Sequence, residues 1–524
     1  MKETKGGFFM GFWYENTLVY HIYPLGFCGA PKFNEGGEVV YRLDKVISWI
    51  PHLKEMNVGA VYFGPVFESA EHGYDTTDYK IIDRRLGDNA SFKKICGALH
   101  EAGIKIILDG VFNHVGRNFP GFKDVQERGS NSEYCSWFKN LNPGGKSPYG
   151  DNFSYEGWQG HYNLVKLNLR NNTVCDYLLD VVNFWINEFD VDGIRFDAAD
   201  CIEFDFFTRV RSFAKSKKSD FWLMGEIIHG DYKRWANPQM LDSVTNYECY
   251  KGIFSSHNDK NYFEINYSIN RQTGNGGIYK DITLYTFVDN HDVNRLASAL
   301  TNTAHLKNCY TLLYTMPGVP SVYYGSEYGI KGAKANNSDD NLRPDLDLKE
   351  LGALGGENAE IYRHIINLGK VRALYPAIGR GEFVTVLILN RQMLFMRRFG
   401  HETVYIALNL DDREFRFEFD SREQVSDVLG GLPVECNGNR ASVNVPAFSS
   451  AILAVGAAAE PQETITATAT PVETEKIAVK YEVSGTVEIN GVKGEVIALA
   501  KDVKTKKDTV VYRDGNGAVW TADI

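Results

Sequence analysis

The 524-residue chain lacks any apolar run of about 18 residues, the length that marks a membrane-spanning helix, so we expect no membrane segment. Residues 1–17 contain only a short apolar patch interrupted by glycine, without a small-residue cleavage site, which argues against a secretory signal peptide. The 8 cysteines are scattered and form no CxxC pair. Scattered cysteines fit reduced thiols better than a disulfide framework, and we therefore predict a cytoplasmic protein.

The chain also lacks an excess of basic charge. It has 56 Lys and Arg against 67 Asp and Glu, a formal net charge of −11. This balance argues against nucleic acid or an anionic membrane as the main partner, and it suits a neutral or cationic ligand. Apolar residues make up 44% of the chain and aromatic residues 13%, which is enough for large cores and excludes general disorder.

From residue 18 onward, short apolar runs alternate with longer helical patterns. The runs predicted as strands are 18–24, 59–65, 104–112, 191–197, 221–227, 243–248, 282–290 and 320–325. Eight strands separated by amphipathic helices predict an α/β fold of the (β/α)₈ TIM barrel type, with the catalytic barrel spanning residues 1–376.

Composition predicts three further parts of the chain. Residues 112–166 are far too long for an ordinary loop after strand three, so we expect an inserted subdomain there. Residues 377–456 alternate like strands and predict a C-terminal all-β sandwich domain. Residues 457–480 are rich in Thr, Ala, Pro and Glu, which indicates a linker. Residues 481–524 predict a small β tail, with a hairpin turn at Asn490-Gly491.

Polar residues gather where the predicted strands end, which in a TIM barrel is the position of the active site. They are Asp109, Asn113 and His114 after strand three, Arg195 and Asp197 on strand four, Glu226 on strand five, His291 and Asp292 on strand seven, and Tyr74 and Asp75 in the loop after strand two. A structural ion pair between Arg195 and Asp197 is the competing interpretation. The ring of acids around one barrel end favours a functional site.

This set of side chains suits glycoside hydrolysis, which needs an ionised carboxylate as nucleophile and a protonated carboxyl as acid/base. Arg195 shares a strand face with Asp197 and would favour its ionised form. Glu226 precedes apolar Ile227 and Ile228, a setting that can keep a carboxyl protonated.

Four segments, "DGVFNH", "GIRFDAAD", "GEIIHG" and "FVDNHD", resemble in order the four signature regions of the alpha-amylase family of glycoside hydrolases. The stretches "GAVYFGPVFES" and "GVPSVYYGSEYGIKG" agree, so the resemblance covers nearly all of residues 18–456. It implies that 112–166 is the family's domain B and that α-glucosidic bonds are hydrolysed with retention. Asp197 would be the nucleophile, Glu226 the acid/base and Asp292 the transition-state stabiliser.

The resemblance also implies substrate-binding roles. Arg195 would orient Asp197, while His114 and His291 would bind sugar hydroxyls and Tyr74 would stack on the same ring. Asp109 would support the site from strand three. Arg343 would hold a sugar further out, and a solvated salt bridge is its alternative. Trp158 would stack on a sugar or belong to the core of domain B.

Within the family, "LVKLNL" and "GEIIHG" resemble the cyclomaltodextrinase, neopullulanase and maltogenic amylase group, although the N-terminal β domain of that group is not expected here. The expected substrate is an α-glucan oligosaccharide, and the protein would be a monomer or a homodimer. No cofactor is required; Ca²⁺ on Asn113 is an alternative to a structural hydrogen bond. Transglycosylation, or a non-catalytic sugar-binding role, remains the competing function. Preference between α-1,4 and α-1,6 bonds is left open.

Overall fold

The computed structural model describes residues 12–335 and 338–456 in full. It describes only the backbone of four further segments, 485–489, 492–501, 508–514 and 519–523. The predicted linker 457–480 and the predicted turn at Asn490-Gly491 lie outside the described residues.

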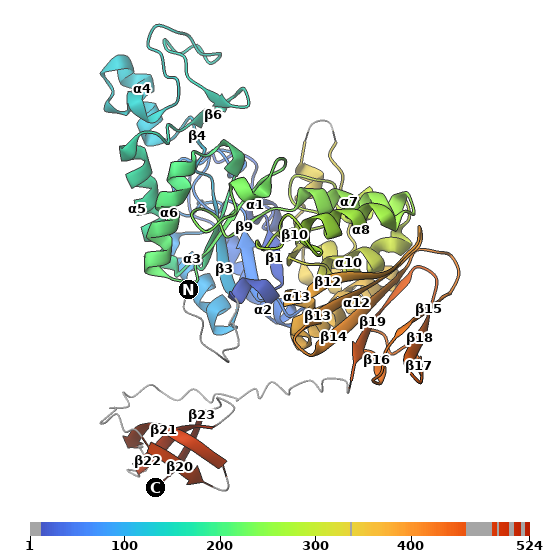
Figure 1. Cartoon of the computed structure of the whole chain (residues 1–524). Coiled ribbons are helices and arrows are strands. Elements are labelled where there is room, and N and C mark those ends of the chain that lie inside the picture. Colours follow the sequence, from blue (N-terminus) through green and yellow to red (C-terminus); the bar gives the residue numbers. More distant parts are fainter. Residues whose placement is uncertain are drawn as a thin grey trace. The chain divides into compact units, whose positions relative to one another are not determined.

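Eight parallel strands form the barrel at the centre of Figure 1. They are β1 (Val19–Ile22), β2 (Ala60–Phe63), β3 (Lys105–Gly110), β7 (Gly193–Phe196), β8 (Trp222–Gly225), β9 (Ser243–Val244), β10 (Tyr285–Phe287) and β11 (Val319–Tyr323). Their order is β10-β11-β1-β2-β3-β7-β8-β9, and a parallel bridge between Thr245 and Tyr285 joins the two ends. Seven strands lie within their predicted runs, and β11 begins one residue before its run, so the predicted TIM barrel is confirmed.

Helices surround the barrel on its outer side (Figure 1). The longer ones are α2 (Lys45–Glu55), α3 (Asn89–Glu101), α5 (Asn172–Phe189), α6 (Phe204–Lys217), α7 (Tyr247–Asn258), α8 (Tyr262–Thr273), α10 (Leu306–Thr315) and α12 (Gly356–Leu374). Short helices are α1 (Pro24–Phe27), α9 (Leu296–Ala299), α11 (Leu348–Gly352) and α13 (Pro376–Arg380). Between β8 and β9 the connection contains only the 3₁₀ turn Tyr232–Arg234.

The helix α5 illustrates how the sequence forms this outer layer. The side chain of Asn171 accepts a hydrogen bond from the backbone N–H of Thr173 and so caps the first turn. Apolar residues recur every three or four positions from Val174 to Trp185, and this stripe is buried against the barrel. The helix stops at Asp190, which adopts a left-handed conformation with φ 56°.

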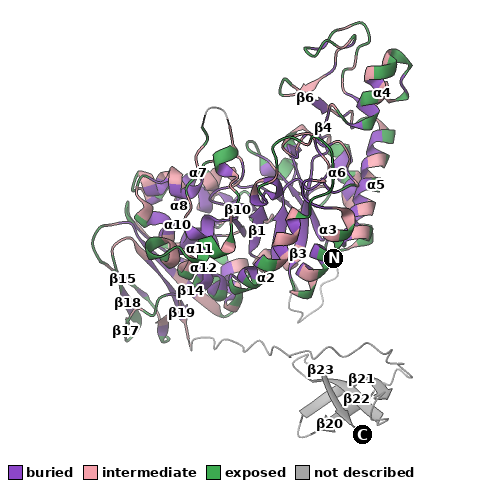
Figure 2. Ribbon diagram, turned by 180° about the vertical axis from the view of Figure 1, so that it is seen from behind, coloured by how far each residue is buried: buried purple, intermediate pink, exposed green. Residues whose placement is uncertain are grey.

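Apolar and aromatic side chains fill the interior of the barrel. One cluster of buried side chains includes nine residues from the barrel strands: Val19, Ala60, Tyr62, Ile107, Trp222, Met224, Tyr285, Phe287 and Val319. Figure 2 shows the strands almost wholly in the buried colour, with exposed residues on the outer helix faces. Because the interior is packed, a ligand can reach the barrel only at its ends.

The insertion after β3 forms a separate lobe at one end of the barrel (Figure 1). It contains β4 (His114–Gly116), α4 (Pro120–Arg128), β5 (Gly157–Trp158) and β6 (His161–Lys166), with the sheet order β4-β6-β5. Phe122 contacts the rings of Phe138, Phe153 and Tyr155, so the lobe has a small aromatic core of its own. The backbone N–H of Leu167 donates to the carbonyl of Asn113 at 3.0 Å, which joins the two ends of the insertion.

The C-terminal domain has two antiparallel sheets around an apolar core. One sheet has the order β12-β13-β14-β19-β16 and the other β15-β18-β17. The strands are β12 (Glu382–Ile388), β13 (Gln392–Phe399), β14 (Glu402–Asn409), β15 (Phe415–Asp420), β16 (Val425–Asp427), β17 (Val434–Asn437), β18 (Arg440–Val445) and β19 (Ser449–Val455). Leu394, Phe417, Val443 and Leu453 from both sheets share one core, which confirms the predicted β domain.

The chain divides into two compact units, Met1–Ala459 and Glu460–Ile524. The second contains the antiparallel sheet β20-β21-β22-β23, formed by Gly485–Ile489, Val492–Lys501, Asp508–Asp514 and Val519–Asp523. In the described part of the chain, no helix has the length and apolar character needed to cross a bilayer. All 8 cysteines are free.

Candidate active site

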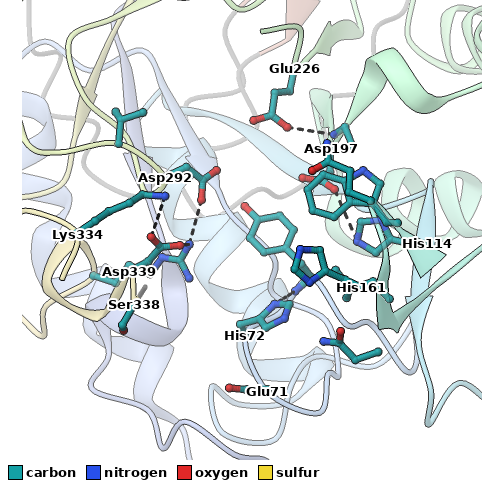
Figure 3. Close-up of a pocket in the computed structure, with 18 of the residues that line it drawn as sticks. Glu71, His72, His114, His161, Asp197, Glu226, Asp292, Lys334, Ser338 and Asp339 are labelled. Carbon is teal, nitrogen blue, oxygen red and sulfur yellow. Dashed lines mark hydrogen bonds and ion pairs between the residues drawn. The ribbon is translucent and has the colours of Figure 1, made fainter. Parts of the chain in front are cut away.

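A pocket of about 850 Å³ opens where the barrel strands end, between the inserted lobe and the loop that carries Lys334 and Asp339. Figure 3 shows Asp197, Glu226 and Asp292 around this pocket, with His72 and His161 across from Glu226. The predicted residues that line it are Tyr74, His114, Trp158, Asp197, Glu226, Asp292 and Arg343. Side chains that are far apart in the sequence thus share one cavity.

Arg195, on β7, lies behind the pocket and connects three carboxylates. Its Nη1 is 2.8 Å from Asp109 Oδ1 and 3.0 Å from Asp197 Oδ1, and its Nη2 is 2.8 Å from Glu226 Oε2. The side chain is only 4% exposed, so little water screens these charges. One guanidinium therefore holds acids from three neighbouring strands in fixed positions.

Asp197 directly follows β7 and is 8% exposed. Burial raises the pKa of this carboxyl well above its ordinary value, Glu226, Asp109 and Asp292 raise it further, and the Arg195 guanidinium opposes them. The next residue, Ala198, has φ 44°, a left-handed conformation that is unusual for alanine. This turn aims the Ala198 N–H at Glu226 Oε2, at 3.1 Å. Backbone strain at the site thus helps to position the second carboxylate.

Asp292 lies on the opposite side of the pocket, after β10. Burial raises its pKa, but His291 at 2.9 Å and Arg343 at 3.0 Å lower it more, and the net pKa is well below the ordinary range. Arg343 Nη2 also contacts Asp339 at 3.1 Å, and its guanidinium lies over the ring of Tyr23. Asp292 is therefore held as a carboxylate beside a fixed cation.

Tyr74 is fixed by contacts on two sides. Its hydroxyl donates to Asp109 Oδ2 at 3.1 Å and is hydrogen-bonded to His291 Nε2, and its ring stacks on His291. Asp109 is 2% exposed and also accepts a hydrogen bond from Tyr62 at 2.7 Å. Asp109, Arg195 and His291 lie behind the pocket lining, so in this structure they support the residues that face it.

His114 lies at the start of β4, and its Nε2 is 3.9 Å from Asp197 Oδ2. Burial lowers the pKa of His114 to about 3, so the imidazole is neutral. Asn113 Nδ2 lies 3.0 Å from His114 Nδ1, and an amide N–H there requires Nδ1 to accept. The proton of His114 is then on Nε2, which has no partner among the described residues and is free to donate to a ligand.

Asn113 was the one residue predicted as an alternative Ca²⁺ ligand. It is 1% exposed, and its amide nitrogen is hydrogen-bonded to His114. Within residues 12–335 and 338–456, no group of three His, Cys, Asp or Glu side chains is arranged to hold a metal ion. The surroundings of Asn113 thus fit the hydrogen-bond alternative better than a cation site.

Several pocket residues were not predicted from the sequence. Tyr247, at the start of α7, has its hydroxyl 3.4 Å from Glu226 Oε1. Tyr23, which lies behind the pocket lining, follows β1 and stacks on His291, and the rule of polar residues at strand ends could have found it. Lys334 contacts Asp339 at 3.0 Å on the rim. Trp158, by contrast, was predicted either to stack on a sugar or to belong to the core of domain B; it lines the pocket and stacks on His114, which places it beside the site.

Comparison with known proteins identifies the family. Residues 22–353 match the family model described as the alpha-amylase catalytic domain. A maltogenic alpha-amylase of Bacillus acidopullulyticus is 29% identical over 447 residues, which cover 79% of this chain and 72% of the relative. A cyclomaltodextrinase of Thermoanaerobacter pseudethanolicus is 28% identical over 459 residues, covering 83% and 77%.

Solved structures agree. The debranching enzyme of Nostoc punctiforme superposes with a TM-score of 0.72 at 26% identity, covering 85% of this chain and 100% of that one. A cyclomaltodextrinase structure gives a TM-score of 0.74 at 25% identity, covering 84% and 78%. The resemblance to the cyclomaltodextrinase and maltogenic amylase group is confirmed. Since the family model spans more than half of the chain, this protein belongs to the alpha-amylase family and is a glycoside hydrolase.

Proposed function

We propose that this enzyme hydrolyses α-glucosidic bonds, mainly α-1,4, in maltooligosaccharides or related short α-glucans, with retention of configuration. Asp197 is the nucleophile, Glu226 the acid/base and Asp292 the stabiliser of the transition state. The observation that carries the proposal is the guanidinium of Arg195, which lies within 3.0 Å of Asp197 and 2.8 Å of Glu226. Retaining enzymes need two such carboxyls close together, about 5–5.5 Å apart.

The reaction has two steps. In the first, an Asp197 oxygen attacks the anomeric carbon while Glu226 gives its proton to the departing glycosidic oxygen, and a glycosyl ester forms on Asp197. In the second, a water molecule loses a proton to Glu226 and attacks the same carbon, which releases Asp197. The permanently charged Asp292 faces the pocket and favours the positive charge that develops on the sugar in both steps.

The neutral side chains would orient the sugar. His114 presents a free Nε2–H beside Asp197, a donor for a hydroxyl of the ring that is attacked. Tyr74 presents an aromatic ring to the pocket and is fixed by Asp109 and His291. An aromatic ring that stacks on a sugar and an N–H that donates to its hydroxyls can both bind a neutral carbohydrate.

The substrate class rests on the relatives. Those described above carry the names maltogenic alpha-amylase, cyclomaltodextrinase and debranching enzyme. These names support short α-glucans, linear or cyclic, as substrates of this chain. A sugar in place of water as acceptor would turn the second step into transglycosylation, and the product distribution at high maltotriose concentration separates the two outcomes.

The test combines three variants with product analysis. Glu226→Gln should lower kcat on maltotriose by about 10²–10⁴-fold, and Asp197→Asn by more. Asp200→Asn is the matched control, because Asp200 also lines the pocket but contacts none of the three acids. Proton NMR of the first products should show the α anomer. Accumulation of the β anomer, or turnover of Asp197→Asn within about tenfold of wild type, would contradict the proposal.

A further inference from the structure

Tyr247 is a pocket residue with no assigned role. It begins α7, and its ring packs edge-on against Phe287 at 4.9 Å. Its hydroxyl is 3.4 Å from Glu226 Oε1 and accepts a hydrogen bond from Asn290 Nδ2 at 3.3 Å. Because Asn290 supplies the donor to the hydroxyl oxygen, the hydroxyl hydrogen is free to point to Glu226.

The two oxygens of Glu226 have different surroundings. Oε2 receives Arg195 Nη2 at 2.8 Å and the Ala198 N–H at 3.1 Å. Oε1 has one hydrogen-bond partner in the described part of the chain, the hydroxyl of Tyr247. Two donors already occupy Oε2, so the proton that Glu226 transfers resides on Oε1, and Tyr247 is the residue beside it.

Resting on the function proposed above, we propose that Tyr247 is a positioning residue for the acid/base, which holds Oε1 toward the glycosidic oxygen and donates to it when Glu226 is a carboxylate. During glycosylation the Oε1 proton moves to the glycosidic oxygen, the bond from that oxygen to the anomeric carbon breaks, and the Asp197 ester forms. The hydroxyl of Tyr247 then turns its hydrogen to the charged Oε1. In the second step, water returns a proton to Oε1 as its oxygen displaces Asp197.

Three observations bear on the proposed hydrogen bond from the Tyr247 hydroxyl to the charged Glu226 carboxylate. Burial and the charge of Glu226 raise the pKa of Tyr247 well above its ordinary value, so the hydroxyl keeps its proton. The distance of 3.4 Å is longer than the usual O–H···O length of about 2.7–2.8 Å. Hydrogen bonds of catalytic groups are often long before substrate binds and shorten in the complex. Asn290 Oδ1 also accepts from the Asp292 N–H at 2.8 Å, so one amide places Tyr247 relative to Asp292.

The pH dependence follows from the charges that face Glu226. Arg195 Nη2 lies 2.8 Å from Glu226, Asp197 and Asp292 line the same pocket, and none of these charged groups is altered when Tyr247 loses its hydroxyl. A hydrogen-bond donor to a carboxylate favours its charged form, and Tyr247→Phe removes one such donor from Glu226 Oε1. On the alkaline side of the profile of kcat/KM against pH, its upper limb, the fall in kcat/KM reports the essential acid. In Tyr247→Phe this fall should therefore occur at higher pH.

The experiment compares Tyr247→Phe with Tyr250→Phe in the full-length enzyme. Tyr250 lies one turn further along α7 and stacks on Phe287 at 5.1 Å, and none of the described residues hydrogen-bonds to its hydroxyl. For Tyr247→Phe the upper limb on maltotriose should move up by about half to one pH unit, and kcat should fall by about three- to tenfold. Tyr250→Phe should leave both unchanged.

A second substrate isolates the proton transfer. Fluoride leaves α-maltosyl fluoride without a proton from Glu226, so kcat/KM for this substrate should change by no more than about twofold in Tyr247→Phe. An upper limb that stays in place, or equal losses on both substrates, overturns the role of Tyr247. A Glu226→Gln enzyme that keeps full activity on maltotriose overturns the proposed function instead, whatever Tyr247→Phe does. Thermal melting of both variants shows whether they are folded.

Discussion

Replacing Arg195 tests the electrostatic design of the site most directly. Arg195→Met keeps most of the apolar stem of the side chain but removes the one charge that contacts Asp109, Asp197 and Glu226. Two unit charges about 4 Å apart interact by about 4 kcal/mol at an effective dielectric constant of about 20. Loss of this attraction should raise the pKa of Asp197 further, because burial and the neighbouring carboxylates then act on it unopposed.

The ionised fraction of Asp197, and with it kcat/KM on maltotriose, should then fall at neutral pH by more than about tenfold, and by at most the roughly 10³-fold that about 4 kcal/mol corresponds to. If protonation of Asp197 is the cause, kcat/KM of Arg195→Met should recover as the pH rises above 7. Wild type should level off at a lower pH than the variant. The assay is a kcat/KM profile over pH, with circular dichroism at each pH to confirm that the variant is folded.

Two controls separate this effect from a general loss of stability. Arg195→Lys keeps the charge but loses the planar fork, so its loss of activity should be smaller and nearly independent of pH. Arg117→Met removes a guanidinium that pairs with Asp151 at 2.9 Å in the inserted lobe, away from the acids, and should keep near wild-type activity. The reasoning fails if folded Arg195→Met stays within about tenfold of wild type at pH 7, or if its pH profile has the wild-type shape.

Three other predictions concern Arg343 beside Asp292, the residues after 456, and the stability of the fold at acid pH. Arg343→Ala removes the cation 3.0 Å from Asp292 and should lower kcat/KM on maltotriose by about tenfold or more, measured beside Lys334→Ala as a rim control. A chain ending at residue 456 should keep kcat/KM on maltotriose, because every proposed catalytic group lies in the first unit; a folded but inactive short chain would contradict this. Burial lowers the pKa of His257 to about 3, so the unfolded chain binds a proton below about pH 6.5 that the folded chain does not. Stability should fall as pH drops from about 6.5 toward 3, and His257→Gln should flatten that slope in urea unfolding measurements.

The barrel strands could be predicted because each is a short, continuous apolar run buried on both faces. Such a run can be recognised in the sequence without knowing how the surrounding helices pack, as the eight barrel strands show. The helix expected between β8 and β9 is absent, since residues 228–242 form turns around the segment Tyr232–Arg234. That stretch contains Gly230 and Pro238, which favour turns, and it lacks the apolar stripe of an amphipathic helix.

The positions of the acids could be predicted from strand ends, but their partners could not. Arg195 was expected to hold Asp197, two residues away on the same strand face. Its contacts to Asp109 and Glu226 exist only because β3, β7 and β8 are neighbours in the closed sheet. The approach of Tyr247 to Glu226 likewise depends on how α7 begins after β9, which no local pattern encodes.

The proposed mechanism fixes a balance of charge around the pocket. With Glu226 as its protonated acid and Asp197 as its ionised nucleophile, Asp109, Asp197 and Asp292 contribute three negative charges, and Arg195 and Arg343 contribute two positive ones. The remaining negative charge lies in a cavity with a filled barrel below it and has no cation of its own among these residues. A transition state with positive charge on the sugar ring supplies that cation, whereas a neutral substrate does not. Under the proposed mechanism, the site would therefore bind the transition state more strongly than the ground state, which is the condition for catalysis.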